Sequence, residues 1–182
     1  MTDATKEIKV EKIVPEMRER LLTNSTGKLT VSQWTDIVTQ PIVSLFILLV
    51  PLTFIIPRLI WGFGVWMIGF LLLILIGVIL MRAFRYARLP VQFEKMQAEA
   101  DSAPFWMIWR GSVLADDAGK QMRFNSRLAP PPRLKRQTTY DVFYLRDNDR
   151  LILLSIAPAN HPDAKRWQPT KAFETRLKRR KG

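Results

Sequence analysis

Apolar side chains fill residues 37–81 almost without interruption. From Leu59 to Met81 there is no charged residue, and these 23 residues would reach about 34 Å as a helix, against about 30 Å for the hydrocarbon core of a bilayer. The stretch before them is similar, because only four of its side chains are polar: Thr39, Gln40, Ser44 and Thr53. The pattern predicts two transmembrane helices, spanning about residues 37–57 and 59–81, that form a hairpin.

Pro57 and Arg58 divide the apolar run in its middle, where the hairpin would turn. Proline disfavours helical geometry in the residue before it, and a charge at the centre of a bilayer costs about 2.5–3.5 kcal/mol on insertion scales. The turn carries only this one basic residue, whereas several basic residues flank the hairpin on its other side. By the positive-inside rule, the sequence predicts a multi-pass integral membrane protein with both termini in the cytoplasm.

The pattern after the hairpin changes from helical to strand-like near Phe105. We expect the second helix to continue to Pro90, followed by a short helix at 91–100. Strands are then expected at 106–115, 120–128, 138–145 and 150–157. Asp116–Gly119 and Arg146–Asp149 have the composition of hairpin turns, and residues 151–154 are apolar on both faces, as in a central strand.

Together these patterns predict an α+β membrane protein, with a two-helix transmembrane hairpin followed by a small antiparallel β-domain of four to five strands that is barrel-like. The layout is similar, in architecture alone, to bacterial membrane proteins with a helical hairpin and a small cytoplasmic β-domain, and no motif identifies a family. Five regions follow: an N-terminal cytoplasmic segment with a short amphipathic helix (1–36), the transmembrane hairpin (37–81), a juxtamembrane helical connector (82–104), the β-domain (105–160) and a basic C-terminal tail (161–182).

The net charge of +12 is concentrated toward the C-terminus. Residues 171–181 form either a basic helix or a disordered arm, and three more arginines directly follow the second predicted span. Anionic lipid head groups attract basic residues close to a membrane surface. Nucleic acid is not the expected polyanion, because alternation places one face of each aromatic strand in the core. The candidate contacts for lipid head groups or another polyanion are Arg82, Arg85, Arg88, Arg176, Lys178, Arg179, Arg180 and Lys181.

No pattern in the sequence indicates catalysis. The 182 residues include no cysteine, which excludes thiolate metal sites and cysteine nucleophiles. His161 is the only histidine, and its loop is typical of a turn or capping residue. The aspartate pairs Asp116–Asp117 and Asp147–Asp149 fall where turns are required, and neither offers enough oxygen ligands for calcium. We expect no enzyme activity, no metal and no cofactor.

The leading hypothesis is a non-catalytic integral membrane protein, an accessory or scaffolding subunit of a larger membrane assembly, with membrane lipids and other proteins as partners. The predicted β-domain is near the lower size limit for independent stability, which favours support from another subunit. The alternative is a self-sufficient membrane-surface module, whose β-domain and basic tail bind anionic lipid or another polyanion.

Overall fold

The computed structural model describes residues 13–39, 64–98, 113–129, 134–135 and 137–181. The chain forms two compact units. The first unit combines Met1–Thr30 with Pro90–Gly182, and the second is Val31–Leu89. The second unit therefore interrupts the first along the sequence.

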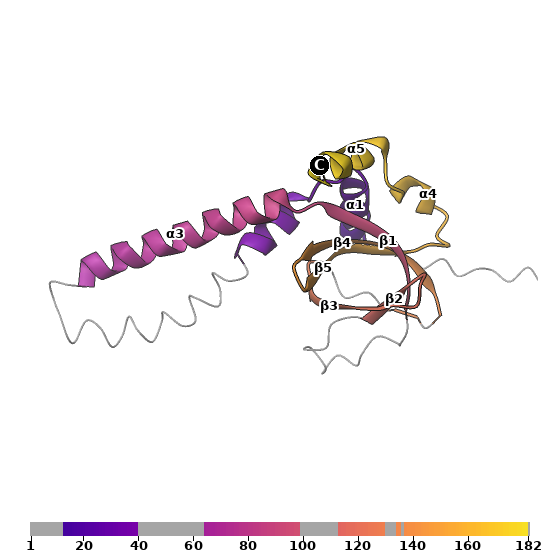
Figure 1. Cartoon of the computed structure of the whole chain (residues 1–182), viewed down its shortest axis with the longest axis horizontal. Helices are drawn as coiled ribbons and strands as arrows, with labels where there is room; N and C mark the ends of the chain where they lie inside the picture. Colours follow the sequence, from indigo (N-terminus) through magenta and orange to yellow (C-terminus); the bar gives the residue numbers. More distant parts are fainter. Residues whose placement is uncertain (1–12, 40–63, 99–112, 130–133, 136, 182) are drawn as a thin grey trace, which may run out of the picture. The chain divides into compact units, whose positions relative to one another are not determined.

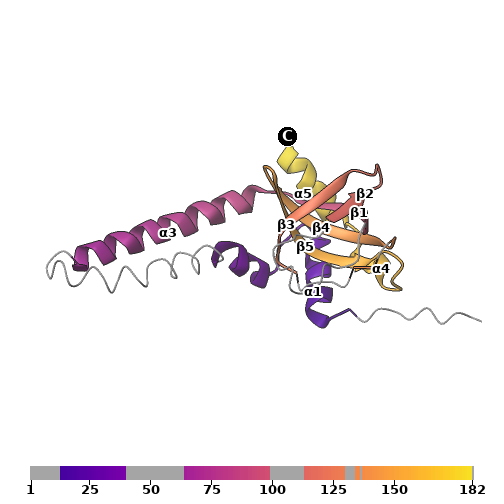
Figure 2. The same ribbon diagram turned by 90° about the horizontal axis from the view of Figure 1, so that it is seen from below.

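A five-stranded mixed sheet forms the centre of the first unit (Figures 1 and 2). Its strand order is β1-β2-β3-β5-β4, and β4 pairs with β1, so the sheet closes on itself. All pairs are antiparallel except β3 with β5, which run parallel. The strands are β1 (Val91–Ala98), β2 (Val113–Asp116), β3 (Gln121–Arg127), β4 (Thr139–Asp147) and β5 (Arg150–Pro158).

Three helices belong to the same unit: α1 (Pro15–Asn24), α4 (Ala164–Trp167) and α5 (Lys171–Lys181). Successive side chains of β4 point to opposite faces of the sheet, so both faces need apolar cover. On one face Tyr144 packs edge-on against Phe124, with 5.7 Å between ring centroids. On the other, Phe143 contacts Phe93 of β1 and Phe173 of α5. This double cover explains why β4 and β5 are buried along most of their length.

The predicted turns are confirmed. Asp116 accepts hydrogen bonds on Oδ1 from the backbone N–H groups of Ala118 and Lys120, at 2.9 Å each, and Gly119 has a φ of 77°. Glycine adopts this left-handed conformation at no steric cost. Between β4 and β5, Asn148 takes the positive φ of 53° that the tight turn requires. The buried strand predicted at 151–154 is also confirmed, because β5 lies between β3 and β4.

Two predictions about the β-domain are wrong. Residues 91–98 form a strand and not a helix, because seven of them pair with β4, from Val91 opposite Leu145 to Gln97 opposite Thr139. This long-range pairing outweighs a local pattern that resembled a helix. The sheet is mixed and not antiparallel, since β3 joins β5 in parallel. Most of the strand predicted at 106–115 lies outside the described residues, which resume at 113 with β2.

The second unit contains a helical segment at 31–39 and the long helix α3 (Gly64–Arg88). These two pieces meet where Arg82 donates a hydrogen bond from Nη1 to the carbonyl oxygen of Ile37, at 3.4 Å. Ile37 and Tyr86 are both buried. This end of α3 is therefore packed against its own unit.

Among the residues that the structure describes, no helix combines the length and the apolar character needed to cross a membrane. This finding overturns the predicted fold class, with its two-helix transmembrane hairpin, and the predicted multi-pass localisation with cytoplasmic termini. The described part of helix α3 runs from Gly64, and its uncharged stretch before Arg82 rises about 27 Å. The first predicted span from position 40 onward, and the predicted turn at Pro57 and Arg58, lie outside the described residues.

Candidate functional site

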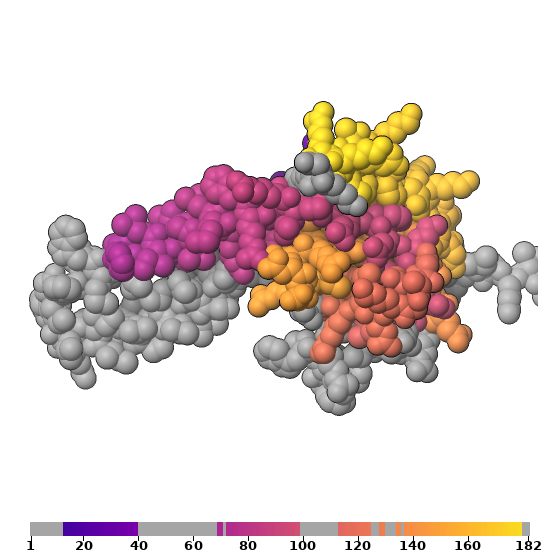
Figure 3. Space-filling view, viewed as in Figure 1, coloured from indigo at the N-terminus to yellow at the C-terminus, as the bar shows by residue number. Residues whose placement is uncertain are grey.

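The surface of α3 is the most apolar exposed surface in the described part of the chain. Phe70, Met81 and Phe84 are 65%, 70% and 66% exposed. Figure 3 shows the side chains of this helix, in magenta, on the face of the molecule that it draws. Contiguous exposed apolar side chains on this scale mark surfaces that another molecule covers. The exposed members of the set are Phe70, Leu72, Leu73, Ile74, Ile76, Val78, Leu80, Met81 and Phe84.

A narrow stripe of α3 differs from the rest, because its side chains are partly or fully buried. The stripe recurs every three or four residues, which places it on one side of a helix with about 3.6 residues per turn. Its members are Leu75, Ile79, Arg82, Ala83 and Tyr86. At Arg82 the stripe contacts the segment 31–39 of the same unit. Among the described side chains, nine large apolar ones elsewhere on α3 stay exposed.

Helix α5 carries the second conspicuous surface, which is basic. The backbone N–H and the hydroxyl of Thr170 both donate to the carbonyl oxygen of Ser25, at 3.0 Å each, at the start of the helix. Phe173 is buried against the sheet. The tail region 171–181 is therefore a docked helix and not a disordered arm. Its anchored side leaves Arg176, Lys178 and Arg179 exposed.

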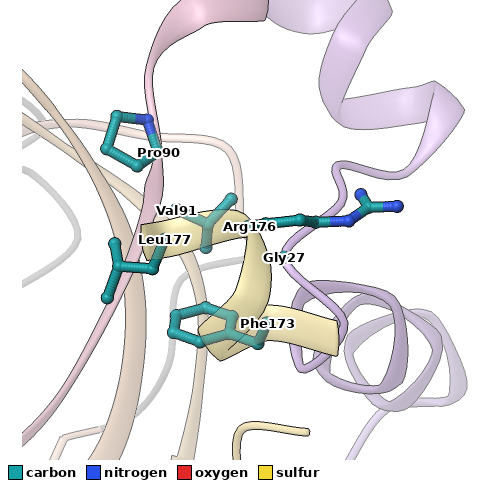
Figure 4. A pocket seen from close by; sticks show the side chains of 6 residues that line it. All are labelled: Gly27, Pro90, Val91, Phe173, Arg176 and Leu177. Atoms are coloured by element: carbon teal, nitrogen blue, oxygen red, sulfur yellow. The ribbon is translucent and has the colours of Figure 1, made fainter. Parts of the chain in front are cut away.

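A shallow pocket marks the place where α5 meets β1 and the loop after α1 (Figure 4). Its volume is about 10 Å³, room for one water molecule at most. Gly27 has a φ of 76°, and a Cβ placed there would lie 3.4 Å from Cδ of Arg176. The pocket is lined by Gly27, Pro90, Val91, Phe173, Arg176 and Leu177. It is a packing junction that holds α5 in place and is too small for a ligand.

The predicted polyanion contacts divide between the two units. Arg82, Arg85 and Arg88 lie on α3, and Arg82 binds a backbone carbonyl of its own unit. The other five lie on α5: Arg176, Lys178, Arg179, Arg180 and Lys181. Their role in binding lipid head groups or another polyanion stays a prediction.

Several buried polar groups were not singled out by sequence reasoning. Asn24 of α1 donates from Nδ2 to the hydroxyl of Ser155 at 2.8 Å. Arg20 is only 5% exposed and donates to Glu16 at 2.6 Å, and its Nε and Nη1 have no partner among the described residues. The available signal was spacing, because Arg20 and Asn24 share the buried side of α1 with Met17. The hydrogen bond from Asn24 to Ser155 orients α1 on β5.

The chain matches no family model, curated protein or solved structure. The function of the chain therefore has to be inferred from the side chains that its own surfaces expose.

Metal chemistry finds no support in the described residues, which contain no group of three or more His, Cys, Asp or Glu side chains placed to hold an ion. His161 acts as the predicted turn residue: its Nδ1 accepts a hydrogen bond from the backbone N–H of Asp163 at 3.1 Å. Its ring packs against Trp167, with 4.9 Å between centroids.

Asp141 of β4 is buried, and only one of its two carboxylate oxygens has a hydrogen-bond partner among the described residues. Its Oδ2 accepts a hydrogen bond from Nε2 of Gln168 at 2.8 Å, and its Oδ1 has no partner among the described residues. Burial raises the pKa of this carboxyl above its ordinary value, although the charge of Lys95 and the Gln168 hydrogen bond partly oppose the shift. The folded state thus holds the Asp141 proton more tightly than the unfolded state does.

We expect Asp141→Asn to stabilise the first unit at neutral pH relative to acid pH. A raised carboxyl pKa favours folding below the unfolded value of 3.8, and that contribution is lost as the pH rises through the folded pKa. Asparagine keeps an oxygen for Gln168 and does not ionise. Urea unfolding across pH 3–8 should show the advantage of the variant growing with pH. Asp117→Asn, at an exposed turn, controls for the change in net charge; a difference that does not vary with pH would contradict the expectation.

Proposed function

We propose that this chain is a non-catalytic accessory or scaffolding protein, which joins a larger assembly through α3. The observation that carries the proposal is the row of large apolar side chains from Phe70 to Phe84 that no described residue covers. Protein surfaces that are apolar over several consecutive helical turns bind other proteins.

The free energy gained by burying apolar side chains favours binding of another protein to this helix. Burying one large apolar side chain contributes about 1.5–3 kcal/mol, and nine such side chains are exposed on α3. Association costs an estimated 4–15 kcal/mol in lost freedom of motion, with more for ordering of side chains. Burial of about half of the exposed set would offset the lower part of this cost. Because α3 is already helical, little further ordering of its backbone is required.

The experiment is native mass spectrometry of the full chain, produced at low level in its natural cells and isolated in mild detergent. We expect a foreign subunit in a fixed stoichiometry. The double variant Leu72→Gln/Ile76→Gln, at two exposed apolar positions of α3, should lose that subunit, because two amides replace apolar contacts.

A matched control makes the same exchange elsewhere. Val14 and Leu22 are exposed apolar residues outside α3, with 56% and 45% exposure, and Val14→Gln/Leu22→Gln should retain the foreign subunit. Isolation of the wild-type chain with no foreign subunit, or retention of the subunit by the α3 variant, would contradict the proposal.

A further inference from the structure

The side of α3 opposite its buried stripe carries a set of side chains that is symmetric in chemical type about Gly77. At about 100° per residue, this set lies half a turn away from the stripe that includes Leu75, Ile79 and Tyr86. Its positions fall at 3, 4 and 7 residues on either side of the glycine. The members of this seam are Phe70, Leu73, Ile74, Gly77, Leu80, Met81 and Phe84, and all of them are exposed.

Any helix face has symmetric positions, but the side chains of this seam are matched as well. Phenylalanine stands at both ends, a pair of adjacent apolar side chains without rings lies on each side, and the smallest residue is at the centre. An interface between two identical copies related by a two-fold axis requires this self-complementarity, because each residue on one copy meets its symmetric counterpart on the other. A foreign helix would place no such requirement on the sequence.

We infer that α3 pairs antiparallel with α3 of a second copy of this chain, about a two-fold axis at Gly77. In this arrangement Phe70 meets Phe84 of the second copy, Leu73 meets Met81, and Ile74 meets Leu80. The two helices approach most closely at the glycine, where no described atom beyond the helix's own adjacent turns lies within 4 Å of the position that a Cβ would take. Small residues at the crossing point shorten the distance between helix axes. This inference rests on the proposed function, in which another protein covers α3, and it identifies a second copy of this chain as one such protein.

Charge selects the antiparallel direction. The three arginines of α3, at positions 82, 85 and 88, all lie near its C-terminal end. Parallel pairing would place both sets side by side, where like charges repel. Antiparallel pairing separates the two Arg85 positions by about 24 Å along the axis, well beyond the Debye length of about 8 Å at physiological salt.

The two glycines of α3 provide a matched pair of variants. Gly77→Leu places a side chain at the crossing point and should weaken self-association about tenfold or more, because the helices are forced apart. Gly69→Leu makes the same exchange beside the seam, eight residues away. A Cβ added at either position would meet no described atom within 4 Å beyond its own turn of helix, and both exchanges raise helix propensity. A loss of pairing in Gly77→Leu alone therefore does not come from misfolding.

Cross-linking tests the direction of pairing. The chain has no cysteine, so any disulfide between two copies must come from the single cysteine that a variant introduces. Gly77→Cys should form an intermolecular disulfide in the full chain under mild oxidation. Leu73→Cys should not, because antiparallel pairing separates the two thiols by about 12 Å along the axis, and a disulfide needs Cα atoms about 4.4–6.8 Å apart.

The outcomes separate this inference from the proposed function. Two copies, cross-linked at position 77 only and weakened by Gly77→Leu, support the pairing whether or not a foreign subunit is also present. Cross-linking at both positions means parallel pairing and overturns the inference. A foreign subunit bound to a single copy overturns the pairing but leaves the accessory function standing. A single chain covered only by detergent or lipid overturns both.

Discussion

Replacing Phe143 with alanine is expected to lower the free energy of unfolding of the first unit by about 3–5 kcal/mol. The ring is fully buried, 4.9 Å from Phe93 and 6.2 Å from Phe173 between centroids. Alanine removes both aromatic contacts, each worth about 0.5–1.5 kcal/mol beyond burial, and leaves a cavity where β1, β4 and α5 meet. Since domains are typically stable by about 5–15 kcal/mol, this loss is a large fraction of the total.

Urea unfolding of the full chain, followed by far-ultraviolet circular dichroism, measures the effect. Phe143→Leu keeps most of the volume and should cost less than about 1.5 kcal/mol. Phe84→Ala removes the same ring from the exposed seam of α3, and should leave the unfolding transition of the first unit unchanged. If Phe143→Ala unfolded at the wild-type urea concentration, the packing of α5 on the sheet through this ring would be wrong.

Trp167 of α4 is the second position where a large loss of stability is expected. The residue is 1% exposed and packs against His161, so Trp167→Ala should cost about 3–5 kcal/mol. Its indole Nε1 is buried and has no hydrogen-bond partner in the described part of the chain. Phenylalanine therefore loses no hydrogen bond, and removes a donor whose unsatisfied burial costs about 1–3 kcal/mol.

The comparison of Trp167→Phe with Trp167→Ala isolates the role of the ring. We expect the phenylalanine variant to unfold close to the wild-type urea concentration and the alanine variant well below it. Equal losses in the two variants would mean that Nε1 has a partner after all, and that the indole acts through its N–H group.

Local chemistry along the chain was sufficient to predict the turns and most of the strands. The Asp116–Gly119 turn, the β4–β5 hairpin and the buried strand at 151–154 each follow from short patterns: turn residues, alternation and a run apolar on both faces. Strand β1 could not be found this way. Its pairing partner lies more than forty residues later, and its own sequence carries a mixed pattern. The parallel contact of β3 with β5 is equally non-local.

The sites show the same division. Composition located the basic residues of the C-terminal tail, but it does not distinguish a helix that spans a membrane from one whose apolar surface binds a protein, and the apolar run of α3 fits both patterns. The buried contacts of Arg20, Asn24 and Asp141 depend on which helix covers which strand. No spacing rule within one segment supplies that information.

The interruption of the first unit by the second also affects the order of events during synthesis. Asn24 and its partner Ser155 are separated by 131 residues. At a synthesis rate of about 5–20 residues per second, α1 therefore emerges from the ribosome roughly 10 s before β5 has been made. A helix of ten residues is not stable alone. Met17 and Leu21 thus stay exposed for that interval, so α1 depends on residues made much later in synthesis for its cover.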